Sequence, residues 1–171
     1  MIKSQRVQLL RKKGFNLQEE SRKINGLPAI KCDRSSKEWG NPYKIICEKD
    51  SVLILNERMD ADNFYKKVVV YRAPIEYKEE AIKKSIEFYK QMIKDNDEEI
   101  EKVKQEYLEA EAEDPCYEHP WKEMELREAE REINTEKIKE QLKGYNLACW
   151  CPLGQICHCD VLLEIINREE K

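Results

Sequence analysis

The sequence lacks any long hydrophobic run. No apolar stretch approaches the roughly 20 residues that a helix needs to cross a bilayer, so we expect no association with a membrane. The N-terminal segment is basic, but it has neither the continuous apolar region nor the small-residue cleavage site of a signal peptide. We therefore expect a cytoplasmic protein. In a reducing cytoplasm, the seven cysteines are predicted to be thiols and not disulfides.

The sequence also lacks an even distribution of charge. The net charge is −4, yet residues 1–50 hold twelve Lys or Arg against six Asp or Glu, whereas residues 95–140 hold seven against eighteen. The basic part suits phosphates, and the acidic part would repel nucleic acid. We do not expect nucleic acid to be the main partner, unless the two regions point in opposite directions.

Short apolar, partly β-branched segments indicate strands. They lie at residues 6–10, 28–32, 43–47, 51–56, 67–71 and 145–151. The segment 67–71, KVVVY, is expected to be buried on both faces. Strands that alternate with helices predict an α/β fold: a small Rossmann-like, partly parallel sheet with flanking helices.

Residues 76–142 interrupt this pattern and predict a charged helical hairpin within a single domain of residues 1–171. A long amphipathic helix follows Pro74, and a second helix is expected at 121–142. The seam of the first helix has a 4-3-4 spacing: Ile82, Ile86, Tyr89, Ile93, Ile100, Val103 and Tyr107. This seam would pack on the sheet or the second helix, or would support a homodimer.

The richest segment chemically is NLACWCPLGQICHCDVLL, at residues 146–163. It is predicted to form a strand, a turn and a helix, so that Cys149 and Cys151 share one face and Cys157 and His158 begin the helix. Asp160 lies in the first helical turn, where a carboxylate complements exposed N–H groups. A thiol there would have a lowered pKa beside an imidazole, so the candidate catalytic residues are Cys151, Cys157, His158 and Asp160.

Two other interpretations of the segment remain open. Four side chains within ten residues offer zinc ligands, namely Cys149, Cys151, Cys157 and His158, although the spacing departs from the usual knuckle of two cysteines separated by two to four residues. The thiols can also be purely structural, because cysteine is among the most often buried residue types.

A second candidate region is the 33–43 loop, DRSSKEWGNPY. Arg34 and Ser35 can hold a phosphate, Trp39 offers a stacking face and Asn41 can orient a base or sugar. Gly40 allows a ligand to approach the backbone closely. The alternative is a capped surface loop in which Trp39 covers the core.

The two segments together resemble domain-of-unknown-function family 4326, a set of small proteins of bacteria and their phages. The resemblance rests on the Trp-Gly-Asn-Pro string at 39–42 and on Cys-Trp-Cys-Pro at 149–152, followed by Cys157, His158 and Asp160. It implies a phage or mobile-element setting, in the host cytoplasm if a phage encodes the chain. The family commonly has a small residue at position 159, which argues against Cys159 as a ligand or nucleophile. The acidic stretch of about 90–135 is longer than the family needs and is expected to be an insertion.

These observations lead to one main hypothesis and two alternatives. The main hypothesis is a domain that binds, and in one version processes, a small nucleotide-like or phosphorylated ligand between the 33–43 loop and the 149–160 segment. The alternatives are a zinc-stabilised protein-interaction module and a coiled-coil adaptor built on the hairpin. The sequence leaves open whether the protein is an enzyme.

Overall fold

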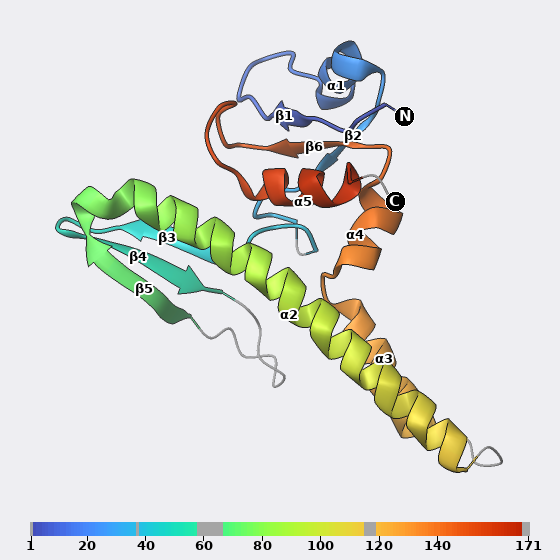
Figure 1. Cartoon of the computed structure of the whole chain (residues 1–171). Coiled ribbons are helices and arrows are strands. Elements are labelled where there is room, and N and C mark those ends of the chain that lie inside the picture. The colour runs from blue at the N-terminus through green and yellow to red at the C-terminus, as the bar shows by residue number, and fades with distance from the viewer. Residues whose placement is uncertain (1, 37, 58–66, 115–118, 169–171) are drawn as a thin grey trace.

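The computed structural model describes residues 2–36, 38–57, 67–114 and 119–168 and shows a mixed α/β fold (Figure 1). The elements in chain order are β1 (Arg6–Gln8), α1 (Leu17–Asn25), β2 (Ala29–Lys31), β3 (Tyr43–Cys47), β4 (Ser51–Asn56), β5 (Val68–Pro74), a 3-10 turn η1 (Ile75–Tyr77), α2 (Lys78–Glu113), α3 (Pro120–Arg131), α4 (Thr135–Leu142), β6 (Asn146–Cys149) and α5 (His158–Ile166). No described helix is long and apolar enough to cross a membrane.

The strands form two sheets, whereas the sequence predicted one. Sheet A is parallel, with β6 between β1 and β2, and pairs Val7 with Ala148 and Ile30 with Leu147. All four residues of β6 are buried, which explains its continuous apolar character. Because the three strands are parallel, the segments that follow Gln8, Lys31 and Cys149 leave the same edge of the sheet.

The structure adds a helix that the sequence analysis did not predict. In α1, the Asn16 side chain accepts hydrogen bonds from the backbone N–H groups of Gln18 and Glu19, and Gly26 ends the helix with a φ of 83°. Both capping signals are present in the sequence. The buried side chain of Asn146 joins this helix to β6, because its Nδ2 donates to Ser21 Oγ at 2.9 Å.

Sheet B is antiparallel, in the order β3-β4-β5, and the N-terminal part of α2 covers one face. The prediction that the 67–71 segment is buried on both faces is wrong. Its strand, β5, is at the edge of the sheet, and Val68, Val69 and Val70 are 50%, 47% and 38% exposed. A run of valines gives the same sequence pattern whether a strand is central or at an edge, so the pattern could not decide the position.

The 36-residue helix α2 packs on sheet B near its start, contacts α5 further along and then lies beside α3. The C-terminal end of α2 and the N-terminal end of α3 project together away from the sheets (Figure 1). The predicted helix at 121–142 is two helices. The first ends at Arg131, and a new helix, α4, begins after Asn134. The Asn134 side chain caps α4 by accepting a hydrogen bond from Lys137 N at 2.8 Å. Tyr89, Met92 and Ile93 of α2 enter the main core. This core also contains Trp39 and six residues of β6 and α5: Leu147, Cys149, Cys159, Val161, Leu162 and Ile166.

Candidate metal centre

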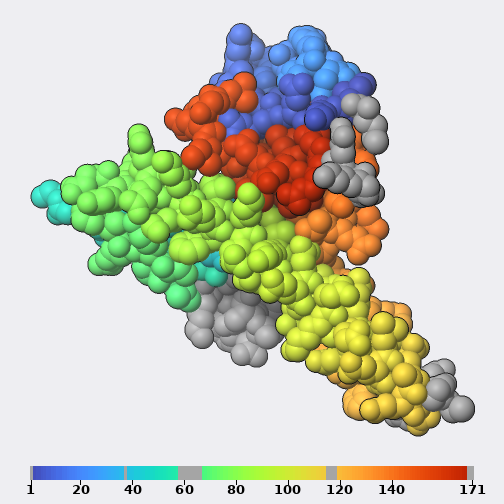
Figure 2. Space-filling model, in the orientation of Figure 1, coloured from blue at the N-terminus to red at the C-terminus, as the bar shows by residue number. Residues whose placement is uncertain are grey.

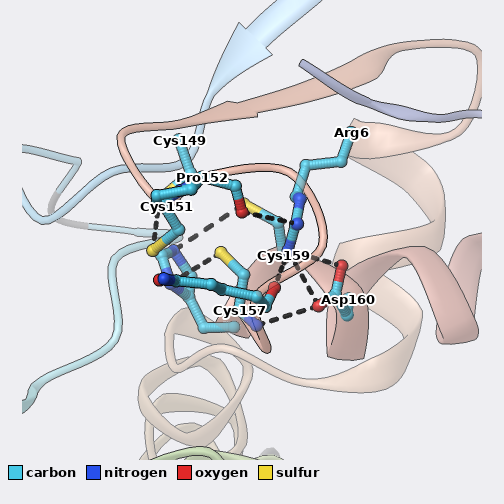
Figure 3. Close-up of polar contacts among 9 residues, drawn as sticks. Arg6, Cys149, Cys151, Pro152, Cys157, Cys159 and Asp160 are labelled. Atoms are coloured by element: carbon cyan, nitrogen blue, oxygen red, sulfur yellow. Dashed lines mark hydrogen bonds and ion pairs between the residues drawn. The ribbon is translucent and has the colours of Figure 1, made fainter. Parts of the chain in front are cut away.

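The candidate site lies where β6 ends and α5 begins, beneath the loop 150–156 (Figure 3). Gly154 has a φ of 90°, a conformation that lets this loop turn back toward the helix. Cys157 is the N-cap of α5, and its backbone N–H donates to Asp160 Oδ2 at 2.8 Å. The predicted strand, turn and helix are therefore formed, with Cys157 and His158 at the helix start.

Four possible metal ligands converge at this corner. They are Cys149, Cys157, His158 and Cys159, and one donor atom from each lies within 4.8 Å of those of the other three. All four residues are buried, with exposed fractions of 4%, 1%, 5% and 0%. The set shares three members with the one predicted from the sequence, and it has Cys159 in place of Cys151.

The imidazole of His158 is fixed by contacts on both nitrogens. Nε2 lies against the backbone carbonyl oxygen of Cys32, so Nε2–H is the donor of that hydrogen bond. Nδ1, 3.7 Å from Cys157 Sγ, then carries the free lone pair. A histidine that binds a metal typically donates its other N–H to a carbonyl or carboxylate in this manner. Tyr89 of α2 adds an edge-to-face contact with the ring, at 5.8 Å between centroids.

The thiols of the corner perturb one another. The hydrogen bond with Cys151, whose Sγ is 3.5 Å from Cys149 Sγ, lowers the pKa of Cys149 to about 6. Contact with Cys149 also lowers the pKa of Cys157, and it raises the pKa of Cys151 and of Cys159. Burial lowers the pKa of His158, but the contacts with Cys157, the Cys32 carbonyl and Cys149 together outweigh burial, so the net pKa is raised. These pKa shifts favour the thiolate at Cys149 and Cys157 and the neutral thiol at Cys151 and Cys159.

The position of Asp160 does not support the predicted pairing with His158. Both carboxylate oxygens lie within 3.0 Å of Arg6 Nη1, and Oδ2 also accepts from the backbone of Cys157. Arg6 reaches across from β1, where its Nη1 also donates to the Gln155 carbonyl and its Nη2 to the Pro152 carbonyl. Asp160 therefore caps the helix and anchors the loop, and within the described residues its hydrogen bonds go to Arg6 and Cys157 and not to the imidazole.

The donor set fits zinc. Thiolate and imidazole are the usual ligands of a structural zinc ion, and a tetrahedral site with bonds of roughly 2.0–2.3 Å separates its donor atoms by roughly 3.5–4 Å. The distance of 3.7 Å between Cys157 Sγ and His158 Nδ1 agrees with that geometry. Cys151 is partly exposed and lies at the rim, beside Cys149.

The loop 33–43 provides less of a ligand site than the sequence predicted. Trp39 is 5% exposed and packs in the core, so its ring is not available for stacking. The carboxamide of Asn41 is buried and occupied: Nδ2 donates to Ser85 Oγ at 3.2 Å, and Oδ1 accepts from Tyr43 N at 2.8 Å. Gly40 serves the turn itself, because a Cβ there would lie 2.6 Å from the Ser36 carbonyl oxygen.

Two predicted ligand-binding residues of this loop remain at the surface. Arg34 and Ser35 are exposed, and the Ser35 N–H donates to Asp33 Oδ1 at 2.9 Å. The other oxygen of Asp33 accepts from Trp150 Nε1. This link was not predicted from the sequence, although Asp33 and Trp150 lie at the carboxyl ends of two predicted strands.

The profile of the family described as Domain of unknown function (DUF4326) matches residues 15–168 of the chain. Comparison with curated proteins and with solved structures gives no match.

Proposed function

The chain belongs to the DUF4326 family, and we propose that it is a zinc-binding α/β domain in which one metal ion holds the corner between β6 and α5. The observation that carries the proposal is the convergence of four buried donors, Cys149, Cys157, His158 and Cys159, from two secondary-structure elements. Cysteine and histidine are the ligands that structural zinc prefers.

A structural role fits the site better than a catalytic one. Four protein donors close a tetrahedral shell, whereas catalytic zinc keeps one position open for water or substrate. The donors are also buried, and the supporting contacts, from Cys32 to His158 and from Arg6 to Asp160, fix the geometry from neighbouring strands. The ion would link the end of the central strand to the helix and hold the exposed loop 150–156 in place.

Metal analysis of untagged protein tests this proposal. We expect about one zinc ion per chain, lost together with thermal stability when a strong chelator is added. Cobalt substitution should produce the thiolate-to-metal absorption of a tetrahedral sulfur-rich site. Protein that is folded, free of metal and indifferent to both chelator and added zinc would contradict the proposal.

Variants identify the ligands. Cys149→Ser and Cys157→Ser should lose the metal, whereas Cys47→Ser, which changes an exposed cysteine on β3, should retain it. Comparison of Cys151→Ser with Cys159→Ser decides the fourth ligand, because the geometry predicts full retention for the first and loss for the second. Loss of the metal in Cys151→Ser together with its retention in Cys159→Ser would instead support Cys151 as the fourth ligand, as the spacing predicted.

A further inference from the structure

The carboxyl edge of sheet A brings exposed cations and an exposed aromatic ring together. The segments that leave β1, β2 and β6 at this edge carry Arg11, Arg34 and Trp150. Lys12 and Lys13 follow Arg11 and are exposed. In open sheets of parallel strands, ligands generally bind beyond the carboxyl ends of the strands.

Trp150 is unusual because it is exposed and yet held in place. Its side chain is 46% exposed. Its Nε1 donates to Asp33 Oδ2 at 2.9 Å, and the guanidinium carbon of Arg11 lies 5.3 Å from the ring centroid. In the chain, Trp150 lies between Cys149, which is buried at the corner, and Cys151, which lies at its rim. An exposed indole with its edge tethered is a preorganised surface for stacking.

Hydrogen bonds hold the Asp33 carboxylate in place, and Asp33 in turn orients the indole ring of Trp150. Its Oδ1 accepts from both the backbone N–H and the hydroxyl of Ser35, and the turn that follows closes with a hydrogen bond from Gly40 N to the Ser36 carbonyl at 3.1 Å. This turn holds Arg34 at the surface, directly beside the residue that tethers Trp150.

The distribution of charge also suits an anion at this edge. The acidic far end of α2 and α3 projects away from sheet A, as Figure 1 and Figure 2 show. The sequence disfavoured nucleic acid as the main partner unless the basic and acidic regions point in opposite directions, and the projection of the acidic helices away from sheet A removes that objection. Stacking on an aromatic ring together with phosphate contacts from arginine is the usual way in which proteins hold an unpaired nucleotide.

We infer that Trp150, Arg11 and Arg34 form a binding site for a nucleotide, with the base stacked on the indole and the phosphate held by the two guanidinium groups. The ligand is a free nucleotide or one unit of a single strand, since both offer the same base and phosphate. The inference goes beyond the proposed zinc centre and does not depend on which metal, if any, the corner holds, because the tether of Trp150 is Asp33.

Binding of two fluorescent probes tests the inference: a labelled single-stranded DNA of about twelve nucleotides and a labelled ATP, measured by fluorescence anisotropy with full-length protein. We expect Trp150→Ala to weaken binding at least fivefold, the lower end of what loss of one stacked base costs. Trp150→Phe should recover part of the loss. Arg11→Ala should weaken binding and flatten its dependence on salt, because one phosphate contact is removed.

Matched controls lie on the hairpin. Trp121→Ala removes an indole that is 60% exposed, and Arg127→Ala removes an exposed guanidinium, both on α3. Neither should change binding. Zinc content and melting temperature are measured for every variant, so that loss of the ligand site is distinguished from loss of the metal corner.

The affinities for the two probes distinguish a single strand from a free nucleotide as the ligand. Tight binding of the oligonucleotide alone identifies a single strand, and binding of ATP with equal affinity identifies a free nucleotide; both support the inference. Absence of binding to either probe by folded wild-type protein overturns it. Binding that Trp150→Ala does not affect also overturns it.

Discussion

The indole Nε1 of Trp150 donates a 2.9 Å hydrogen bond to Asp33 Oδ2, across 117 residues of sequence. This bond joins the two segments that resemble the family most closely, one after β2 and the other after β6. It also explains how a tryptophan that is nearly half exposed keeps a fixed orientation at the carboxyl edge of sheet A.

We predict that Asp33→Asn lowers stability at neutral pH. Burial raises the pKa of Asp33, but hydrogen bonds from Ser35 and Trp150 outweigh burial and hold the pKa below its ordinary value. The ionised carboxylate therefore stabilises the fold above the pKa of the unfolded chain, and this contribution is lost as the pH falls through the lowered value. Thermal melts between about pH 3 and 7 should show the wild type and the variant converging in acid. Equal separation of the two melting curves at every pH would refute the prediction.

Arg6→Ala should destabilise the loop 150–156 and the start of α5. The Arg6 side chain is 9% exposed and contacts Asp160, Pro152 and Gln155, so its removal leaves several acceptors without their donor. The expected loss is about 1–3 kcal/mol in urea unfolding. Lys23→Ala, which breaks ion pairs on the exposed face of α1, should have no measurable effect. Similar small changes in both variants would show that Arg6 forms only a surface ion pair.

Asn41 is predicted to act on stability rather than on ligand binding. Asn41→Ala removes the buried hydrogen bond that Oδ1 accepts from the Tyr43 backbone N–H and the one that Nδ2 donates to the Ser85 hydroxyl, and it should cost about 1–3 kcal/mol. A double-mutant cycle with Ser85→Ala measures the coupling, which should be at least about 0.5 kcal/mol because the two side chains are in direct contact. Additive effects of the two substitutions would argue against this link between the loop and α2.

Gly40→Ala is expected to disturb the turn at 33–40. A methyl group at position 40 would lie 2.6 Å from the Ser36 carbonyl oxygen and 2.9 Å from that of Asp33, and both are backbone atoms that cannot rotate away. Unfolding should become easier by about 1–3 kcal/mol, a typical cost of overpacking. Glu38→Ala changes an exposed residue of the same turn and serves as the control. A neutral result for Gly40→Ala would mean that the turn can widen without cost.

The features that the sequence predicted well depend on neighbours in the chain. Cys157 and His158 begin α5 because Asp160, three residues after Cys157, caps the backbone N–H of Cys157. Cys149 Sγ and Cys151 Sγ lie 3.5 Å apart because only one residue separates them where the chain bends after β6. The α/β class follows in the same way, from local periodicities of apolar residues. The Asn16 and Gly26 caps of α1 are equally local, but its nine residues include only two apolar side chains, Leu17 and Ile24, and so give little apolar periodicity.

Other features depend on contacts between distant parts of the chain, and only the tertiary structure decided them. Whether Trp39 faces solvent or the core depends on Tyr89, fifty residues away, whose hydroxyl donates to the Trp39 carbonyl. The exposure of residues 68–70 depends on the position of β5 at the edge of sheet B. An apolar composition does not distinguish an edge strand from a central one. The imidazole of His158 bonds to the Cys32 carbonyl oxygen because β2 pairs with β6, which brings Cys32 beside the start of α5. The Asp160 carboxylate is bound by Arg6 instead. Local spacing fixes which side chains share a face, but strand order and helix packing determine what those faces meet.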